Sequence, residues 1–168
     1  MPQKEKFPTG MIHLICGEKN EGKTTRFRKI FSTTRKAYGF AADKVFDGAS
    51  LIGYDLVNLR SGASMPLARI RTLADGCAAE GLVNGPFYFN TAGFIWAKKV
   101  FEDARRLGAD AFFLDEVGRI ELGARGHSEL LHAALDSGMD IYMTVRNSNL
   151  GEVVRAFGIR EYTRIRVR

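Results

Sequence analysis

The chain has 168 residues, of which 45% are hydrophobic and 26% are charged, and its formal net charge is +6. This size and balance predict one globular domain over residues 1–168 that is stable without cross-links. No apolar run approaches the ~20 residues of a membrane helix, and the charged first residues are not followed by the apolar segment of a secretion signal. We therefore expect a cytoplasmic protein that does not enter a membrane.

The two cysteines indicate neither a disulfide framework nor a metal site. Cys16 and Cys77 lie far apart in the sequence and lack C-x-x-C spacing. Cys16 ends an apolar run and is expected to be a small buried residue of the core.

The first predicted element is a strand over residues 11–16, which leads into a glycine-containing loop and then a helix over 23–31. The loop matches the pattern G-x-x-x-x-G-K-[ST], whose backbone amides surround phosphate groups. The residues expected to bind nucleotide are Gly17, Glu18, Lys19, Asn20, Glu21, Gly22, Lys23, Thr24 and Thr25.

Each fixed position of this loop has a mechanical task. Gly17 and Gly22 allow the backbone to turn with its N–H groups facing inward. Lys23 is expected to reach the β- and γ-phosphates as a catalytic charge, and the Thr24 hydroxyl to bind Mg²⁺. The unpaired amides at the helix N-terminus add to the attraction for anions. The loop therefore predicts binding of a nucleoside triphosphate with Mg²⁺.

After a short strand over 36–40, the segment 43–90 has a different character. Residues 51–59 read as extended chain, and glycine and proline recur through residues 62–86, while the apolar content stays high. We interpret this segment as an insert rich in β-hairpins within the domain.

The remaining elements alternate between helix and strand. In order, they are a helix over 91–107 capped by Asn90 or Thr91, a central strand over 111–114, a helix from a capping Ser128 to Ser137, a strand over 141–145, a helix over 150–157 and a strand over 162–167. This alternation predicts an α/β fold whose central sheet is mainly parallel, with helices on both faces.

Two carboxylates come directly after the central strand. Because ligands of α/β sheets bind at the carboxyl ends of the strands, Asp115 is expected beside the phosphate loop, where it would hold Mg²⁺. Glu116 is the candidate base that accepts a proton from an attacking water. The pair therefore predicts hydrolysis of the bound triphosphate.

Other polar and aromatic residues allow more than one interpretation. Arg146 comes after the strand over 141–145 and is either a transition-state arginine or a solvated side chain. Glu121 is expected to hydrogen-bond within its loop, and His13 to be a core histidine. Aromatic residues of the strands could include a platform for a nucleobase, although most such residues belong to cores: Tyr38, Phe40, Tyr54, Phe87, Tyr88 and Phe89.

These motifs together resemble the nucleoside-triphosphatases of the THEP1 type. The likeness rests on residues 17–25, Gly39-Phe40, residues 52–59 and residues 66–69, and above all on Asp-Glu-Val-Gly-Arg-Ile-Glu-Leu at 115–122, which is similar to that family's Asp-Glu-Ile-Gly-Lys-Met-Glu-Leu. The resemblance implies a P-loop NTPase fold and Mg²⁺-dependent hydrolysis of nucleoside triphosphates, ATP or GTP among them, to diphosphate and phosphate with loose base selectivity. By position it implies Lys23 and Thr24 for phosphate and metal, Asp115 for metal and Glu116 for water.

The chain departs from the family pattern at several places. Asn20 stands where a third loop glycine is usual, and it is one of the few residues that tolerate a positive φ. Arg119 replaces a lysine, and Glu18 and Glu21 add two carboxylates to a loop that attracts anions.

Two other functions are also compatible with the sequence. A small-molecule or nucleotide kinase would use the insert as an acceptor pocket, with Arg60, Arg69 and Arg71 nearby. A nucleotide-gated binding protein would hydrolyse slowly and contact an acidic partner or RNA through the basic last strand. We favour for that strand an edge position protected by charges, so nucleic acid is not the favoured partner. The sequence leaves the oligomeric state unspecified.

Overall fold

A computed structural model describes residues 10–73 and 81–167, and so leaves Cys77 and the charged first residues outside the described part. Its centre is a sheet of nine strands in the order β5-β6-β4-β3-β2-β7-β8-β1-β9. The strands are β1 (Ile12–Cys16), β2 (Ala37–Asp47), β3 (Ser50–Asn58), β4 (Ser64–Ile70), β5 (Gly81–Asn84), β6 (Phe87–Asn90), β7 (Ala111–Val117), β8 (Asp140–Val145) and β9 (Thr163–Arg166). The helices are α1 (Lys23–Thr33), α2 (Thr91–Arg106), α3 (Arg119–Leu122), α4 (Ser128–Leu135) and α5 (Leu150–Ala156), with single 3₁₀ turns at Arg71–Leu73 and Asn147–Asn149.

The sheet is mixed, so the prediction of a mainly parallel sheet is wrong. Strands β2, β7, β8, β1 and β9 pair in parallel, whereas β5, β6, β4, β3 and β2 pair antiparallel. The physical reason is that β2 does not stop near Phe40 but continues to Asp47 and carries β3 with it. The hairpin-rich segment that the sequence predicts therefore exists, but it extends the central sheet.

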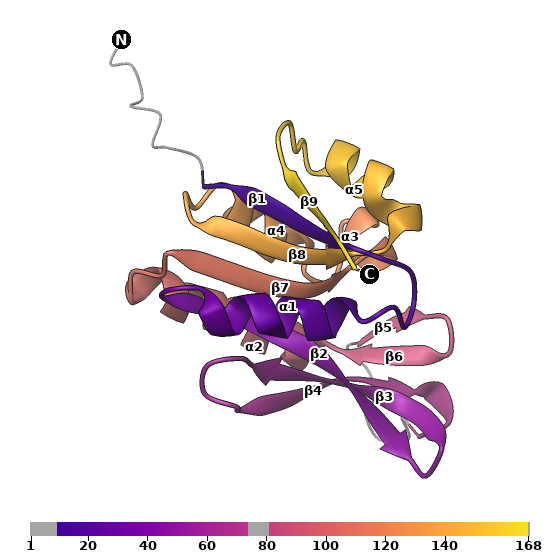
Figure 1. The fold of residues 1–168 in the computed structure, drawn as a ribbon. Coiled ribbons are helices and arrows are strands. Elements are labelled where there is room, and N and C mark those ends of the chain that lie inside the picture. The colour runs from indigo at the N-terminus through magenta and orange to yellow at the C-terminus, as the bar shows by residue number, and fades with distance from the viewer. Residues whose placement is uncertain (1–9, 74–80, 168) are drawn as a thin grey trace.

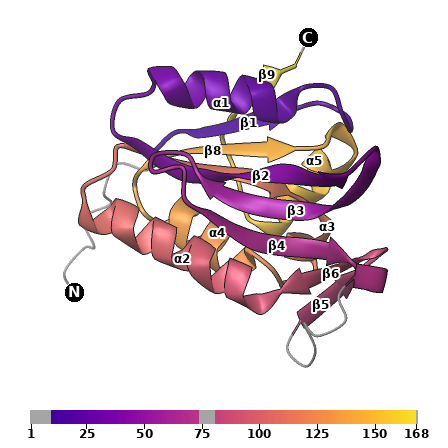
Figure 2. The ribbon, with the colours of Figure 1, turned by 90° about the horizontal axis from the view of Figure 1, so that it is seen from below.

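Helices cover both faces of this sheet, as predicted. In Figures 1 and 2, α1 lies on one face and α2 with α4 on the other. The central strand β7 feeds both cores, because alternate side chains point to opposite faces. Phe113 packs in the cluster with Phe27 of α1, whereas Phe112 packs in the cluster with Phe101 of α2. β7 lies between β2 and β8 and is covered on both faces, which accounts for the unbroken apolar run at its start.

Several local predictions are confirmed. Asn90 caps α2 by accepting a hydrogen bond from the Ala92 amide at 3.0 Å. Cys16 is buried, with 2% of its surface exposed. β9 lies at the edge of the sheet beside β1. None of the helices in the described ranges has the length and apolar character needed to cross a bilayer.

Two local predictions are wrong. Ser128 does not cap α4 but is its first residue, His127 takes the cap position without a side-chain hydrogen bond, and the helix ends at Leu135, before Ser137. His13 is half-buried rather than a core residue, and its ring stacks on Tyr142 at 4.2 Å between centroids.

Candidate nucleotide site

The glycine-containing loop joins the end of β1 to the start of α1. Gly22 precedes the helix with φ of 87°, a left-handed conformation that glycine adopts without a steric cost. Asn20 also has a positive φ, 65°, and so takes the conformation that a loop glycine would otherwise supply. A Cβ on Gly17 would lie 3.0 Å from Oε2 of Glu21, so a larger residue there would displace this side chain. The loop therefore takes left-handed backbone at Asn20 and Gly22, where the sequence has residues that tolerate it.

Two charged side chains of the loop, Lys23 and Glu21, are held by its own backbone. The Lys23 ammonium donates to the Glu18 carbonyl oxygen at 2.6 Å, and Lys23 is buried with 7% exposure. Because this partner is neutral, it leaves the positive charge of Lys23 uncancelled. The Glu21 carboxylate accepts a hydrogen bond from the Glu18 amide at 2.5 Å and thereby braces the turn. Both glutamates are exposed.

Asp115 at the carboxyl end of β7 is the point where distant parts of the chain meet. Its Oδ2 accepts hydrogen bonds from the Thr24 hydroxyl and from the Ala42 amide, each at 3.1 Å. Its Oδ1 accepts from the Thr144 hydroxyl at 2.5 Å. The carboxyl group is 1% exposed, so it is fixed in place by three elements besides its own strand.

Burial raises the pKa of Asp115 to about 6, and the nearby charge of Glu116 acts in the same direction. The hydrogen bonds from Thr144, Ala42 and Thr24 oppose this shift. A buried carboxylate whose ionised form is disfavoured is stabilised by a nearby cation, which has the opposite effect on the pKa. Asp115 is therefore well suited to hold a positive ion.

Glu116 leaves the regular strand. Its φ is 62°, and the pairing of β7 with β8 is irregular between Leu114 and Val117. Its amide donates to the Thr144 hydroxyl oxygen at 2.8 Å. A left-handed conformation is costly for a residue with a side chain and persists where the surroundings enforce it, as at functional sites. The bulge leaves the Glu116 side chain exposed beside the buried Asp115.

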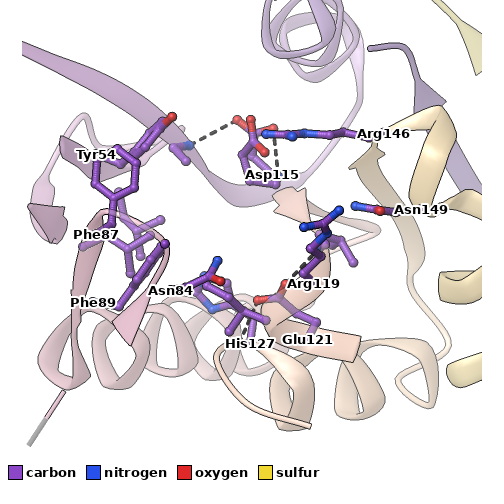
Figure 3. Close-up of a pocket in the computed structure, with 18 of the residues that line it drawn as sticks. Tyr54, Asn84, Phe87, Phe89, Asp115, Arg119, Glu121, His127, Arg146 and Asn149 are labelled. Atoms are coloured by element: carbon purple, nitrogen blue, oxygen red, sulfur yellow. Dashed lines mark hydrogen bonds between the residues drawn. The ribbon is translucent and has the colours of Figure 1, made fainter. Parts of the chain in front are cut away.

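A cavity of about 430 Å³ lies over the loop. The predicted residues that line it are Lys19, Asn20, Gly22, Lys23, Thr24, Thr25, Tyr54, Glu116 and Arg146. Gly17, Glu18, Glu21 and Asp115 lie outside this lining. Arg146, which comes directly after β8, is exposed and extends across the position of Asp115 in Figure 3.

The residues at this site fit a magnesium ion. Mg²⁺ in nucleotide sites uses one or two protein oxygens and takes its other ligands from water and phosphate. The Thr24 hydroxyl and the Asp115 carboxylate meet this requirement. The described residues contain no group of three or more histidine, cysteine or acidic side chains of the kind that holds a metal without a substrate.

Other predicted residues take structural places. Glu121 accepts hydrogen bonds from the Gly118 amide at 2.9 Å and the His127 amide at 3.2 Å, as expected of a loop-bracing residue. Arg69 pairs with Asp55 at 2.8 Å, and the guanidinium of Arg60 lies 4.4 Å from the ring centre of Tyr38. These arginines do not line the cavity over the loop.

Sequence reasoning missed Thr144. Its side chain is fully buried and contacts both carboxyl-bearing residues. The available signal was the one threonine in the apolar strand over 141–145, because a buried hydroxyl needs a partner.

The phosphate loop before α1, the acidic end of β7 and the cavity between them define the class of phosphate-loop α/β proteins. A family model described as NTPase matches residues 13–167. The chain therefore belongs to this NTPase family.

Individual relatives agree with this assignment. The chain is 28% identical over 148 residues to nucleoside-triphosphatase THEP1 of Pyrobaculum aerophilum, covering 86% of this chain and 79% of the relative. It is 26% identical to nucleoside-triphosphatase THEP1 of Thermotoga maritima, covering 81% and 74%. The crystal structure of THEP1 from Aquifex aeolicus superimposes with a TM-score of 0.70 at 21% identity, covering 94% of this chain and 90% of that chain. The fold is thus shared with a solved member, and the resemblance seen in the motifs is confirmed.

Proposed function

We propose that this protein hydrolyses nucleoside triphosphates to diphosphate and phosphate in the cavity over the loop, with Mg²⁺ as cofactor. The observation that carries the proposal is the hydrogen bond from the Thr24 hydroxyl to Asp115, which joins the loop to the acidic strand. Membership of the NTPase family supports the same reaction. The whole chain acts as one domain in this proposal.

Each residue has a distinct part in the reaction. Lys23 and the loop amides bind the β- and γ-phosphates and stabilise the charge that develops there. Thr24 and Asp115 hold Mg²⁺, which when bound neutralises phosphate charge. Glu116 accepts the proton of the attacking water, and Arg146 stabilises the γ-phosphoryl group in the transition state.

Loose base selectivity is a consequence of the same contacts. The loop amides and Lys23 recognise phosphate, and every nucleoside triphosphate carries the same phosphates. The side chains of Glu18 and Glu21 are exposed, so the anion is bound by the backbone amides of the loop. We therefore propose that several triphosphates are hydrolysed at similar rates.

Phosphate release from ATP, GTP, CTP and UTP, with and without Mg²⁺, tests the proposal. Glu116→Gln is expected to bind nucleotide with unchanged affinity and to lose at least ~10²-fold in turnover. Glu102→Gln on α2, far from the loop in sequence and outside its cavity, is the matched control and keeps the parent rate. Equal turnover in parent and Glu116→Gln would refute the role of Glu116, and no phosphate release from any triphosphate would refute the activity.

A further inference from the structure

A second pocket of about 400 Å³ adjoins the first (Figure 3). It lies between the antiparallel part of the sheet, at β3 and β6, and the segment directly after β7. Both cavities are lined by Lys19, Ala42, Tyr54, Glu116 and Arg146, so they meet along these residues, Glu116 among them. A volume of this order is typical of a site for a small organic ligand.

One side of this second pocket is aromatic. The rings of Tyr54, Phe87 and Phe89 lie together in Figure 3, with Phe94 of α2 also in the lining. Tyr54 and Phe87 form an edge-on pair with centroids 5.4 Å apart, and each is half-buried. Aromatic faces of this kind stack with the planar ring of a nucleobase regardless of its identity.

The opposite side carries two arginines, Arg119 and Arg146, beside the carboxyl-bearing residues Asp115, Glu116 and Glu121. Figure 3 shows Arg119 and Arg146 across the pocket from the aromatic rings. Neither arginine forms an ion pair within the part of the chain that the structure describes. Guanidinium groups bind phosphate through paired hydrogen bonds, so these two suit the phosphate of an entering ligand.

His127 supplies an unsatisfied polar atom in the lining. Its side chain is 4% exposed, and Nδ1 has no hydrogen-bond partner among the described residues. Its ring packs near those of Phe40 and Phe94, with centroids 5.1 and 4.9 Å away. Burial lowers the pKa of His127 to about 3, so the ring is neutral at pH 7. A buried polar atom without a partner is unfavourable, and a ligand group that hydrogen-bonds to Nδ1 would remove that penalty.

We propose that this second pocket binds a nucleoside monophosphate, with the base against Tyr54 and Phe87 and the phosphate at Arg119 and Arg146. Because the pocket meets the first cavity at Glu116, the ligand phosphate faces the γ-phosphate of a triphosphate held by the loop. This inference rests on the proposed function, in that it takes the loop to be the triphosphate site.

The reaction expected of two nucleotides placed in this way is transfer of the γ-phosphoryl group. A phosphate oxygen of the monophosphate forms a bond to the γ-phosphorus, and the bond from that phosphorus to the β,γ-bridging oxygen breaks. The bridging oxygen leaves with the electron pair on the nucleoside diphosphate. A monophosphate is largely a dianion at pH 7, so no proton has to be removed from it. The products are two nucleoside diphosphates, and the charges balance.

Calorimetric titration of AMP, GMP, CMP and UMP into protein saturated with Mg²⁺ and a non-hydrolysable ATP analogue tests the binding. Saturation keeps the monophosphates out of the loop site. We expect at least one to bind, and we expect Arg119→Met and Phe87→Ala each to weaken it at least ~10-fold. Arg155→Met on α5, outside both linings, is the matched control and keeps the parent affinity.

Absence of binding by all four monophosphates would overturn the proposal, and so would equal affinity in the parent and both pocket variants. Circular dichroism checks that the variants fold. Phosphate release from ATP alone is unaffected by either outcome, so failure of this proposal is distinguishable from failure of the proposed hydrolysis.

Phosphorus NMR of ATP mixed with the monophosphate that binds, other than AMP, tests the transfer. The expected result is the diphosphate of that nucleoside beside ADP, reduced at least ~10-fold in Arg119→Met but not in Arg155→Met. If inorganic phosphate is the only new product beside ADP, the acceptor role is wrong.

Discussion

The hydroxyl of Thr144 donates to Asp115 at 2.5 Å, and its oxygen accepts the amide of Glu116 at 2.8 Å. One side chain of β8 thus contacts both the carboxylate proposed for the metal and the backbone from which the proposed base extends. The adjacent residues of β8, Met143 and Val145, cannot make these contacts, because their side chains point to the other face of the sheet.

Thr144→Val is therefore expected to lower turnover by ~10–100-fold. Valine keeps the shape of threonine but removes one hydrogen bond from the buried carboxylate and one from the Glu116 amide, which keeps only its bond to Asp115 Oδ1 at 3.1 Å. Hydrogen bonds to charged groups are worth ~1.5–3 kcal/mol. Thr144→Ser restores the hydroxyl and is expected to recover most of the rate. Steady-state phosphate release measures both, and a valine variant as active as the parent would contradict the positioning role.

Asp115→Asn is expected to abolish the effect of Mg²⁺ on nucleotide affinity. In the parent, affinity measured with a fluorescent triphosphate analogue should fall when Mg²⁺ is removed by chelation. In the variant the affinities with and without Mg²⁺ should be nearly equal, because the amide carries no charge to hold the ion. Asp136→Asn, exposed at the end of α4, serves as the control and should respond to Mg²⁺ as the parent does.

His127 is expected to make the protein sensitive to acid. Because its pKa is lowered from 6.5 to about 3 by burial, the unfolded chain binds a proton below pH 6.5 that the folded chain does not. His127 therefore does not lower the free energy of unfolding above pH 6.5, and it lowers that free energy progressively as the pH falls from 6.5 toward 3. The decline is at most ~1.4 kcal/mol per pH unit.

His127→Leu places an apolar side chain between Phe40 and Phe94 and removes the titratable ring. The difference in unfolding free energy between parent and variant, measured by urea denaturation at pH 7, 6 and 5, isolates the histidine from other titrating groups. A difference that does not change with pH would show that the ring is already protonated or exposed.

Gly22→Ala is expected to weaken nucleotide binding strongly. At φ of 87° an alanine is strained by ~1–2 kcal/mol, and relief of that strain would turn the loop amides away from the phosphate. Gly48→Ala is the matched control, since Gly48 also has a positive φ, 56°, and open space around it, but lies in the turn between β2 and β3. Both variants should lose similar stability in thermal denaturation, and loss of nucleotide affinity should occur in Gly22→Ala alone.

The sequence was sufficient for the parts of the site that depend on local order. The loop, the helix after it and the acidic end of β7 are each continuous segments with fixed spacing, and they lie where the motifs predict. Asn20 was expected to tolerate a positive φ, and it has one.

Features that depend on pairing between distant strands could not be predicted from the sequence. The antiparallel half of the sheet arises because β2 continues past Phe40 and pairs with β3, and nothing in residues 36–40 specifies that length. Thr144 becomes important only because the register of β8 sets it beside Asp115. The second pocket combines Phe87, Arg119 and His127 from three separate segments, none of which forms a motif with the others.

The strand with the loop, β1, and the strand with the two acids, β7, are not neighbours, because β8 lies between them. The pairs Ile15–Thr144 and Leu114–Met143 define the register of β8 against β1 and against β7. A slip of β8 by one residue would turn Thr144 to the opposite face and bring an apolar side chain to Asp115. A relative of this protein could therefore retain every residue of both motifs and still lack activity, if the register of the strand between them were shifted.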